Sequence, residues 1–271
     1  MTSTASCTPN NPVLVLNAVE NRVQLAVGRA ERLLFAQEMT VTAKALSVLP
    51  QAVQACVQDL SQGLEGLGGI AVVRGPGAFT GVRVSMAFVL GLARGRNLPM
   101  AGLDYLSVLG IEPCTIVTGE VWICTYARKG LVHIQGFSAP QGQPLCPVQS
   151  LSREEALACL QARSGPVFLA GSGLRQDPKW WKEQLGRAHI LPRSWDHPRP
   201  ETLLQAATGV EYRLKPPMPV YLRPSDAEMH LADIARARGL NPQSARRLIP
   251  DFEHSGAPAR TESDRHPHTD N

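Results

Sequence analysis

Residues 74–85, RGPGAFTGVRVS, form the segment of this chain whose residue types could bind a phosphate group. Backbone N–H groups in a glycine-rich turn before a helix attract anions, and the helix dipole adds to the attraction. A Walker loop also needs a lysine, and a dinucleotide-binding loop needs GxGxxG spacing. This segment has no lysine, and its glycines fall at positions 75, 77 and 81. Neither motif is met, so a tight turn that starts a helix is the favoured interpretation.

In the turn interpretation, Gly75 and Gly77 adopt positive φ angles, and Gly81 lets the following helix approach the sheet. Thr80 or one of its neighbours caps that helix. In the phosphate interpretation, the same loop is an anion site that survives as a vestige of a nucleotide-binding ancestor. The residues of this candidate site are Gly75, Pro76, Gly77, Thr80 and Gly81.

The other reactive side chains do not form a known catalytic pattern. Ser172 lies in GSG after an apolar run, whereas a hydrolase elbow needs GxSxG, so a glycine turn explains it better. The seven histidines form no pair at metal-ligand spacing within a segment that we expect to be ordered. We therefore predict no catalytic residue, no metal site and no peptidase motif.

Composition narrows the class of protein further. No apolar run reaches the roughly 18 residues of a membrane span, and the N-terminal residues lack the features of a signal peptide. The six cysteines contain no CxxC, which indicates reduced thiols in a cytoplasmic protein. The net charge of +4 permits an RNA partner but does not by itself indicate one.

The elements that would position the glycine loop follow a repeated order. The first half reads as three short strands, a helix, a buried strand and a second helix, at residues 13–17, 23–27, 33–38, 42–60, 69–73 and about 80–94. The second half repeats the order at residues 115–118, 121–127, 131–137, 152–163 and 166–173, followed by helices near 178–185 and 200–208. Pro50 should kink the first helix or lie in its first turn. A capping box of Ser152 and Glu155 should open the helix at 152–163. The sequence thus predicts two α/β lobes, each of order βββαβα.

Both helices of the first half carry more apolar surface than one sheet can cover. The helix near 80–94 is apolar almost all round, and the helix at 42–60 has a second stripe of small residues. A partner protein would cover the outer faces, unless the second half or the C-terminal helices do so. The predicted partner interface comprises Ala45, Val48, Ala52, Ala55, Arg83, Met86, Phe88 and Leu90.

Residues 72–110, which begin VVRGPGAFTGVR, resemble the signature of the TsaB (YeaZ) family of bacterial tRNA-modification proteins, typically GRGPGSFTGLR followed by an apolar helix. VLVLNAVENRVQLAV, GEVWICTY and PVYLRPSDAE resemble other family segments, so the resemblance covers about residues 13–228. It implies an α/β fold of the actin-like, Hsp70-like ATPase (ASKHA, ribonuclease H-like) architecture. The expected parts are a flexible N-terminus, two lobes, a helical extension and a disordered tail, at residues 1–12, 13–110, 111–226, 227–253 and 254–271.

The resemblance also implies a non-catalytic role. TsaB-like proteins pair with the catalytic paralog TsaD through their N-terminal-half helices. With a TsaE-like ATPase, they install threonylcarbamoyl on N6 of adenosine 37 in tRNAs that read ANN codons. The chain is then a cytoplasmic scaffold that meets tRNA only through the complex and forms a homodimer if alone. We expect no cofactor on the chain itself, and ATP or ADP only in the complex.

Several positions depart from the catalytic relatives. Tyr105 and Leu109 stand where those proteins have the histidines of HxxxH. Asn17 and, by a less direct alignment, Thr115 stand where ATPases of this fold place an aspartate, and TsaB-like proteins usually keep the first one. Two alternatives remain open at this stage: an independent ATPase or small-molecule kinase of the same fold, and a stand-alone regulatory homodimer.

Overall fold

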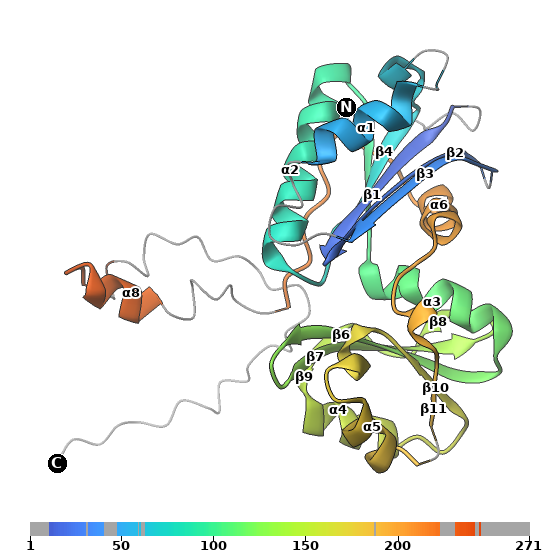
Figure 1. The fold of residues 1–271 in the computed structure, drawn as a ribbon, viewed down its shortest axis with the longest axis vertical. Helices are drawn as coiled ribbons and strands as arrows, with labels where there is room; N and C mark the ends of the chain where they lie inside the picture. Colours follow the sequence, from blue (N-terminus) through green and yellow to red (C-terminus); the bar gives the residue numbers. More distant parts are fainter. Residues whose placement is uncertain are drawn as a thin grey trace. The chain divides into compact units, whose positions relative to one another are not determined.

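The computed structural model describes residues 11–30, 32–40, 48–58, 60, 63–186, 188–222, 231–241 and 244. It divides into two units, Met1–Tyr221 and Leu222–Asn271. The second unit contains helix α8 (Leu231–Ala237), and the first contains both sheets (Figure 1). Within the part of the chain that is described, no helix has the length and apolar character of a membrane span. The predicted disordered tail lies outside these residues.

The first sheet is mixed and has five strands in the order β3-β2-β1-β4-β5. Its strands are β1 (Val13–Glu20), β2 (Arg22–Arg29), β3 (Arg32–Thr40), β4 (Gly69–Val73) and β5 (Met100–Leu103). β1, β2 and β3 form the predicted antiparallel meander, whereas β4 and β5 run parallel to β1. Every residue of β4 is buried, which explains its continuous apolar run.

The second sheet repeats this arrangement in the order β11-β10-β6-β7-β8, with β9 also paired to β7. Its strands are β6 (Gly119–Arg128), β7 (Leu131–Ala139), β8 (Gln143–Pro144), β9 (Gln149–Ser152), β10 (Val167–Ala170) and β11 (His189–Ile190). β6 pairs antiparallel with β7 and parallel with β10, as β1 does with β2 and β4. The predicted repeat of two α/β lobes is therefore confirmed.

The strand predicted at residues 115–118 is wrong. These residues contain the end of helix α3 (Tyr105–Ile116) and the turn into β6. Their β-branched side chains favour a strand by composition, but α3 is buried along most of its length, and tertiary packing overrides such a preference. The second meander is completed instead by β8 and β9, which both pair with β7, and α3 and β5 were not predicted.

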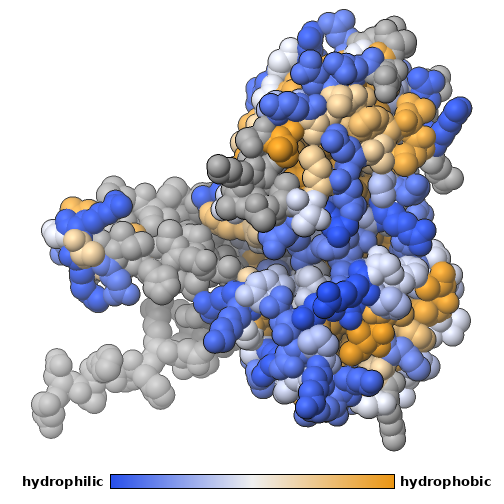
Figure 2. Space-filling model, viewed as in Figure 1, coloured by the Kyte–Doolittle hydropathy of each residue, from blue (hydrophilic) through white to orange (hydrophobic). Residues whose placement is uncertain are grey.

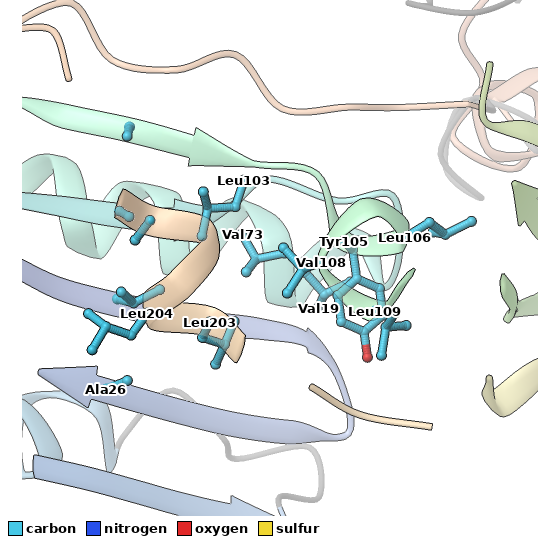
Figure 3. Close-up of a cluster of buried hydrophobic side chains, with 14 of the residues drawn as sticks. Val19, Ala26, Val73, Leu103, Tyr105, Leu106, Val108, Leu109, Leu203 and Leu204 are labelled. Carbon is cyan, nitrogen blue, oxygen red and sulfur yellow. The ribbon is translucent and has the colours of Figure 1, made fainter. Parts of the chain in front are cut away.

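The last helix of each lobe crosses to the sheet of the other lobe. α3 follows β5 but packs against β6 and β7, while α6 (Pro200–Thr208) follows β11 but packs against β1, β2 and β3. Side chains of both helices belong to one core that includes strands of both sheets. Figure 3 shows Leu203 and Leu204 of α6 in this core, with Tyr105 and Leu109 of α3 beside Val19. The predicted boundary between residues 110 and 111 falls inside α3.

Two helices cover the outer face of each sheet (Figure 1). They are α1 (Leu49–Gln58) and α2 (Phe79–Arg96) on the first sheet, and α4 (Arg153–Gln161) and α5 (Pro178–Gln184) on the second. Pro50 lies in the first turn of α1, and the predicted residues 42–47 of this helix lie outside the described part. The capping box of Ser152 and Glu155 is present at the start of α4.

Candidate functional site

The glycine loop connects β4 to α2 and packs against the end of β1. Gly75 has a φ angle of +105°, as predicted, whereas Gly77 does not have the predicted positive φ. Gly77 is needed for space instead, because a Cβ atom there would lie 2.1 Å from Cγ1 of Val19. A Cβ atom on Gly81 would lie 2.1 Å from the carbonyl oxygen of Ala18, so α2 does approach the sheet at Gly81.

Backbone groups of the loop bond to neighbouring elements. The N–H of Ala78 donates to the carbonyl oxygen of Val19 at 2.8 Å, and the carbonyl oxygen of Gly75 accepts from the N–H of Tyr105 at 2.9 Å. The predicted cap is wrong, because the N-cap of α2 is Ala78, which makes no side-chain cap bond. Thr80 lies exposed in the first turn of the helix. The loop is therefore a packed junction between β1, α2 and α3.

Arg83 of α2 holds the segment that returns from the second lobe. Its guanidinium carbon lies 3.6 Å from the ring centroid of Phe79, and its Nε donates to the hydroxyl of Tyr221 at 3.1 Å. The rings of Phe79 and Tyr221 are 4.8 Å apart between centroids. Arg83 is therefore exposed but engaged within the chain, a role that the sequence did not reveal.

The predicted partner interface is only partly a surface. Ala45 lies outside the described residues. Ala52 is only 3% exposed, because α1 turns it toward the sheet together with Val53, so its place in an interface is a misassignment. Arg83 is exposed, and the half-buried members of the set are Val48, Ala55, Met86, Phe88 and Leu90.

Two neighbouring exposed positions in the middle of α2 are small. Ala87 and Gly91 are exposed, and a Cβ atom on Gly91 would meet no atom within 4 Å. Phe88 and Leu90 lie beside them and pack partly on the core of this lobe. Figure 2 shows hydrophobic atoms among hydrophilic ones on this lobe, on the side where α1 lies. We call Ala87, Phe88, Leu90 and Gly91 the α2 ridge; its small residues would let another helix approach closely.

A cluster of polar side chains joins the two lobes around Glu20, the last residue of β1. Its carboxylate accepts hydrogen bonds from the Tyr105 hydroxyl at 2.7 Å and from the Ser172 hydroxyl. Nδ1 of His197 lies 3.4 Å from the same carboxylate. The Ser172 oxygen also accepts from the N–H of Tyr126 at 2.9 Å. We call Glu20, Tyr105, Ser172 and His197 the Glu20 cluster.

Burial shifts the protonation of this cluster toward neutral groups. Burial raises the pKa of Glu20, although the hydrogen bonds from Ser172 and Tyr105 act in the opposite direction. Burial and the nearby carboxylate raise the pKa of Tyr105 well above its ordinary value. The pKa of His197 is lowered by burial and, to a smaller extent, by the charge of Arg22. Burial thus opposes the charged form of both Glu20 and His197.

An ion pair fixes the loop that carries Ser172. Arg175 donates to the two carboxylate oxygens of Asp196 at 2.7 and 2.8 Å, and this carboxylate is 7% exposed. The N–H of Gly171 donates to Asp196 as well, at 3.1 Å. Because the pair is bidentate and shielded from water, it holds the loop in one position beneath Glu20.

Asn17 lies inside β1, and its side-chain amide belongs to a buried hydrogen-bond network. Its Nδ2 donates to Oε1 of Gln24 at 2.8 Å. Nε2 of Gln24 in turn donates to Glu38 at 2.6 Å and to the carbonyl oxygen of Pro198 at 2.7 Å. These bonds fix the orientation of Gln24, so its oxygen faces position 17 and requires a donor there.

We therefore expect Asn17→Asp to lower the free energy of unfolding by about 1–3 kcal/mol, because two acceptors would face each other in a buried site. Urea unfolding at pH 7 measures the change. Asn21→Asp is the matched control, since Asn21 is exposed in the β1–β2 turn and its replacement should change stability by less than about 0.5 kcal/mol. Equal stability of the Asn17 variant and the wild type would contradict this account.

The other three positions compared with metal-binding residues lie on α3. Tyr105 and Leu109 are 0% and 3% exposed and form part of the shared core. Thr115 lies near the end of the same helix, where its hydroxyl donates to the carbonyl oxygen of Glu112 at 2.7 Å. Its predicted place in a strand at residues 115–118 is wrong, because α3 extends to Ile116.

Sequence reasoning missed the Glu20 cluster. Glu20 and Ser172 are 152 positions apart, so no local spacing connects them. One signal was available: Glu20 lies at the end of the first strand and Ser172 follows a buried strand of the second half. Polar residues at such strand ends often meet in α/β proteins.

Comparison with known proteins agrees with this architecture. A family model for TsaD, tRNA N6-adenosine threonylcarbamoyltransferase, matches residues 40–136. The tRNA threonylcarbamoyladenosine biosynthesis protein TsaB of Bacillus subtilis is 26% identical over 183 residues, which are 65% of this chain and 79% of that protein. The protein of the same name from Escherichia coli is 27% identical over 194 residues, 64% of this chain and 80% of the relative.

Solved structures give the class of fold. YeaZ from Pseudomonas aeruginosa superimposes with a TM-score of 0.65 at 22% identity, over 78% of this chain and all of that one. Two mixed sheets of the same strand order, each with a helix from the other lobe, define the actin-like ATPase fold. Within this fold class, the chain is similar to TsaB and YeaZ proteins and, over residues 40–136, to TsaD.

Proposed function

We propose that this chain is a non-catalytic scaffold subunit in the formation of N6-threonylcarbamoyladenosine at position 37 of tRNAs that read ANN codons. It binds a TsaD-like catalytic paralog and holds it in its active arrangement, and a TsaE-like ATPase and tRNA join through the complex. The observation that carries the proposal is the α2 ridge, a small and apolar strip on the outside of a helix that the fold leaves exposed. The pathway in this proposal, threonylcarbamoyladenosine biosynthesis, is taken from the names of the two similar proteins.

The contents of the shared core support a non-catalytic role. Tyr105 is already bonded to Glu20, and Leu109 packs within the apolar core. Both positions are thus used for folding. The Glu20 cluster ties the lobes together through hydrogen bonds between side chains. In this proposal the scaffold role needs no cofactor, and ATP or ADP is held by the assembled complex.

The chemistry of the ridge suggests the kind of surface that fits it. Ala87 and Gly91 leave room for a helix, and Phe88 and Leu90 offer partly exposed apolar side chains on either side. A partner helix with an apolar stripe would bury them, since helices pack closest where their side chains are small. A paralog of similar fold can present such a helix, and a second copy of this chain can do so when the paralog is absent.

Size-exclusion chromatography with light scattering tests the proposal. We expect a 1:1 complex of this chain with the TsaD-like paralog from the same genome. Gly91→Glu should abolish it, because a charged side chain would stand on the ridge. The variant should keep its fold, since the new side chain meets open space.

Gly186→Glu is the matched control. Gly186 is also exposed, and a Cβ atom there would meet no atom within 4 Å. It follows α5 in the other lobe, so the Gly186→Glu variant should form the complex with the paralog as the wild type does. A complex that survives Gly91→Glu would place the interface elsewhere. If wild-type chain and paralog do not associate even with ATP present, the scaffold role is wrong, and ATP hydrolysis by the chain alone becomes the next test.

A further inference from the structure

A cavity of about 450 Å³ opens at the end of the second sheet, next to the turn between β6 and β7. Its walls include Tyr126, Arg128, Lys129, Arg153, Gln176 and Trp181, and we call it the hairpin pocket. Its volume falls within the roughly 300–1,000 Å³ of small-molecule sites in proteins. The proposed scaffold role does not use it.

The topology makes this a favoured place for a ligand. β6 and β10 are neighbouring parallel strands, so their carboxyl ends lie at the same edge of the sheet. The chain leaves β6 toward β7 on one side and leaves β10 toward α5 on the other. Such a divergence between parallel strands opens a crevice in which α/β proteins bind ligands.

The pocket lies on the opposite side of the sheet from the Glu20 cluster. Trp122 and Cys124 of β6 pack in the core beneath α4 and α5, as Trp181 does, whereas Val121 and Ile123 face the core shared with α3. Side chains alternate along a strand, so Tyr126 lies on the side of Cys124. The pocket therefore lies on the other face of the sheet from the Glu20 cluster, although the backbone N–H of Tyr126 donates to Ser172 of that cluster.

The charged groups of the pocket favour an anion. Three of its lining side chains are basic (Arg128, Lys129 and Arg153), and Asp177 is its one acidic group. Arg153 is held in place by ion pairs with Asp177 at 3.1 Å and Glu154 at 3.3 Å, and by stacking of its guanidinium 4.1 Å from the ring centroid of Trp180. A guanidinium that is already oriented loses little side-chain freedom when it binds a phosphate.

The aromatic groups favour a ring next to that anion. Tyr126 is 39% exposed at the end of β6, an unusual exposure for a large side chain in a strand that is otherwise largely buried. Its ring can stack on a base, and the amide of Gln176 can donate to and accept from the edge of that base. We propose that the hairpin pocket binds a nucleotide, with its phosphate at the basic side chains and its base on Tyr126. The nucleotide is either free or part of an RNA strand.

Isothermal titration of the full chain with AMP and with ATP, and filter binding with unmodified tRNA, test this site at low salt. Binding is expected in at least one of the two assays. Lys129→Glu and Tyr126→Ala should each weaken it about tenfold or more. Lys182→Glu is the matched control for charge, because Lys182 is exposed on α5 and does not line the pocket. The affinity of the Lys182→Glu variant for the same probe should stay within about threefold of the wild-type affinity, after allowance for the change in net charge.

The two binding assays distinguish the two sources of the nucleotide. Binding of AMP or ATP assigns the pocket to free nucleotides, and binding of tRNA alone assigns it to RNA. The proposal is overturned if neither probe binds, or if the Lys129 and Tyr126 variants bind as well as the Lys182 variant. These variants should still form the complex with the paralog, so failure at the pocket is separable from failure of the scaffold role.

Discussion

Gly81→Ala is expected to lower the free energy of unfolding by about 3 kcal/mol, the upper end of the usual range for overpacking and the largest stability effect that we predict for a single methyl group. The added Cβ would lie 2.1 Å from the carbonyl oxygen of Ala18. That atom belongs to the backbone of the central strand β1, so no side chain can rotate to relieve the contact. α2 would have to move away from the sheet and disturb the core beneath it. Urea unfolding monitored by circular dichroism measures the loss.

Gly91→Ala on the same helix is the control, and its effect should have the opposite sign. A Cβ atom at Gly91 meets nothing within 4 Å, and alanine is the better helix former by roughly 0.5–1 kcal/mol. The two variants thus make the same chemical change on two sides of α2. If both proved neutral, or if both were destabilising to the same degree, the close approach of α2 to β1 would be contradicted.

Glu20→Gln is expected to gain stability relative to the wild type as the pH rises above about 4.5. Burial raises the pKa of Glu20 in the folded protein, so the folded state keeps a proton that the unfolded chain has lost. That contribution is complete below the unfolded pKa and is lost as the pH rises through the folded pKa. Glutamine is neutral at every pH, so the Glu20→Gln variant does not lose stability in this way as the pH rises. The difference should grow by about 1.4 kcal/mol for each unit by which the pKa is raised.

Urea unfolding at several pH values from 4 to 8 measures this difference. The lowered pKa of His197 has the opposite effect, because its contribution is lost as the pH falls, but His197 is present in both proteins and largely cancels. A Glu20→Gln difference that shrinks as the pH rises would show that the carboxylate is held charged.

The sequence predicted the fold well where local patterns decide it. The alternating runs of β1 to β3, the continuous run of β4 and the capping box before α4 each depend on neighbouring residues. It failed at α3, whose end is rich in β-branched residues but is buried between elements far apart in the chain. Helix and strand propensities depend on local sequence, so they could not reveal that the end of α3 is buried in this way.

The candidate sites were harder to predict for the same reason. Gly81 could be assigned to close packing because it lies at the start of an apolar helix that directly follows a buried strand and a glycine turn. The exclusion of Ala52 from the surface depends on the rotation of α1, and the engagement of Arg83 depends on Tyr221, 138 positions away. The Glu20 cluster and the hairpin pocket both arise where strands from distant parts of the chain end together.

The exchange of helices between the lobes has a consequence for synthesis on the ribosome. The inner face of the first sheet is covered by α6, which is translated only after the whole second sheet. Until then, Ala26 and its neighbours in that core lack the leucines of α6. The first lobe therefore cannot complete its fold as the chain emerges, although domains made early in translation commonly do. A fragment that ends after α3 should expose this face and aggregate, and the nascent chain would need protection over the same interval.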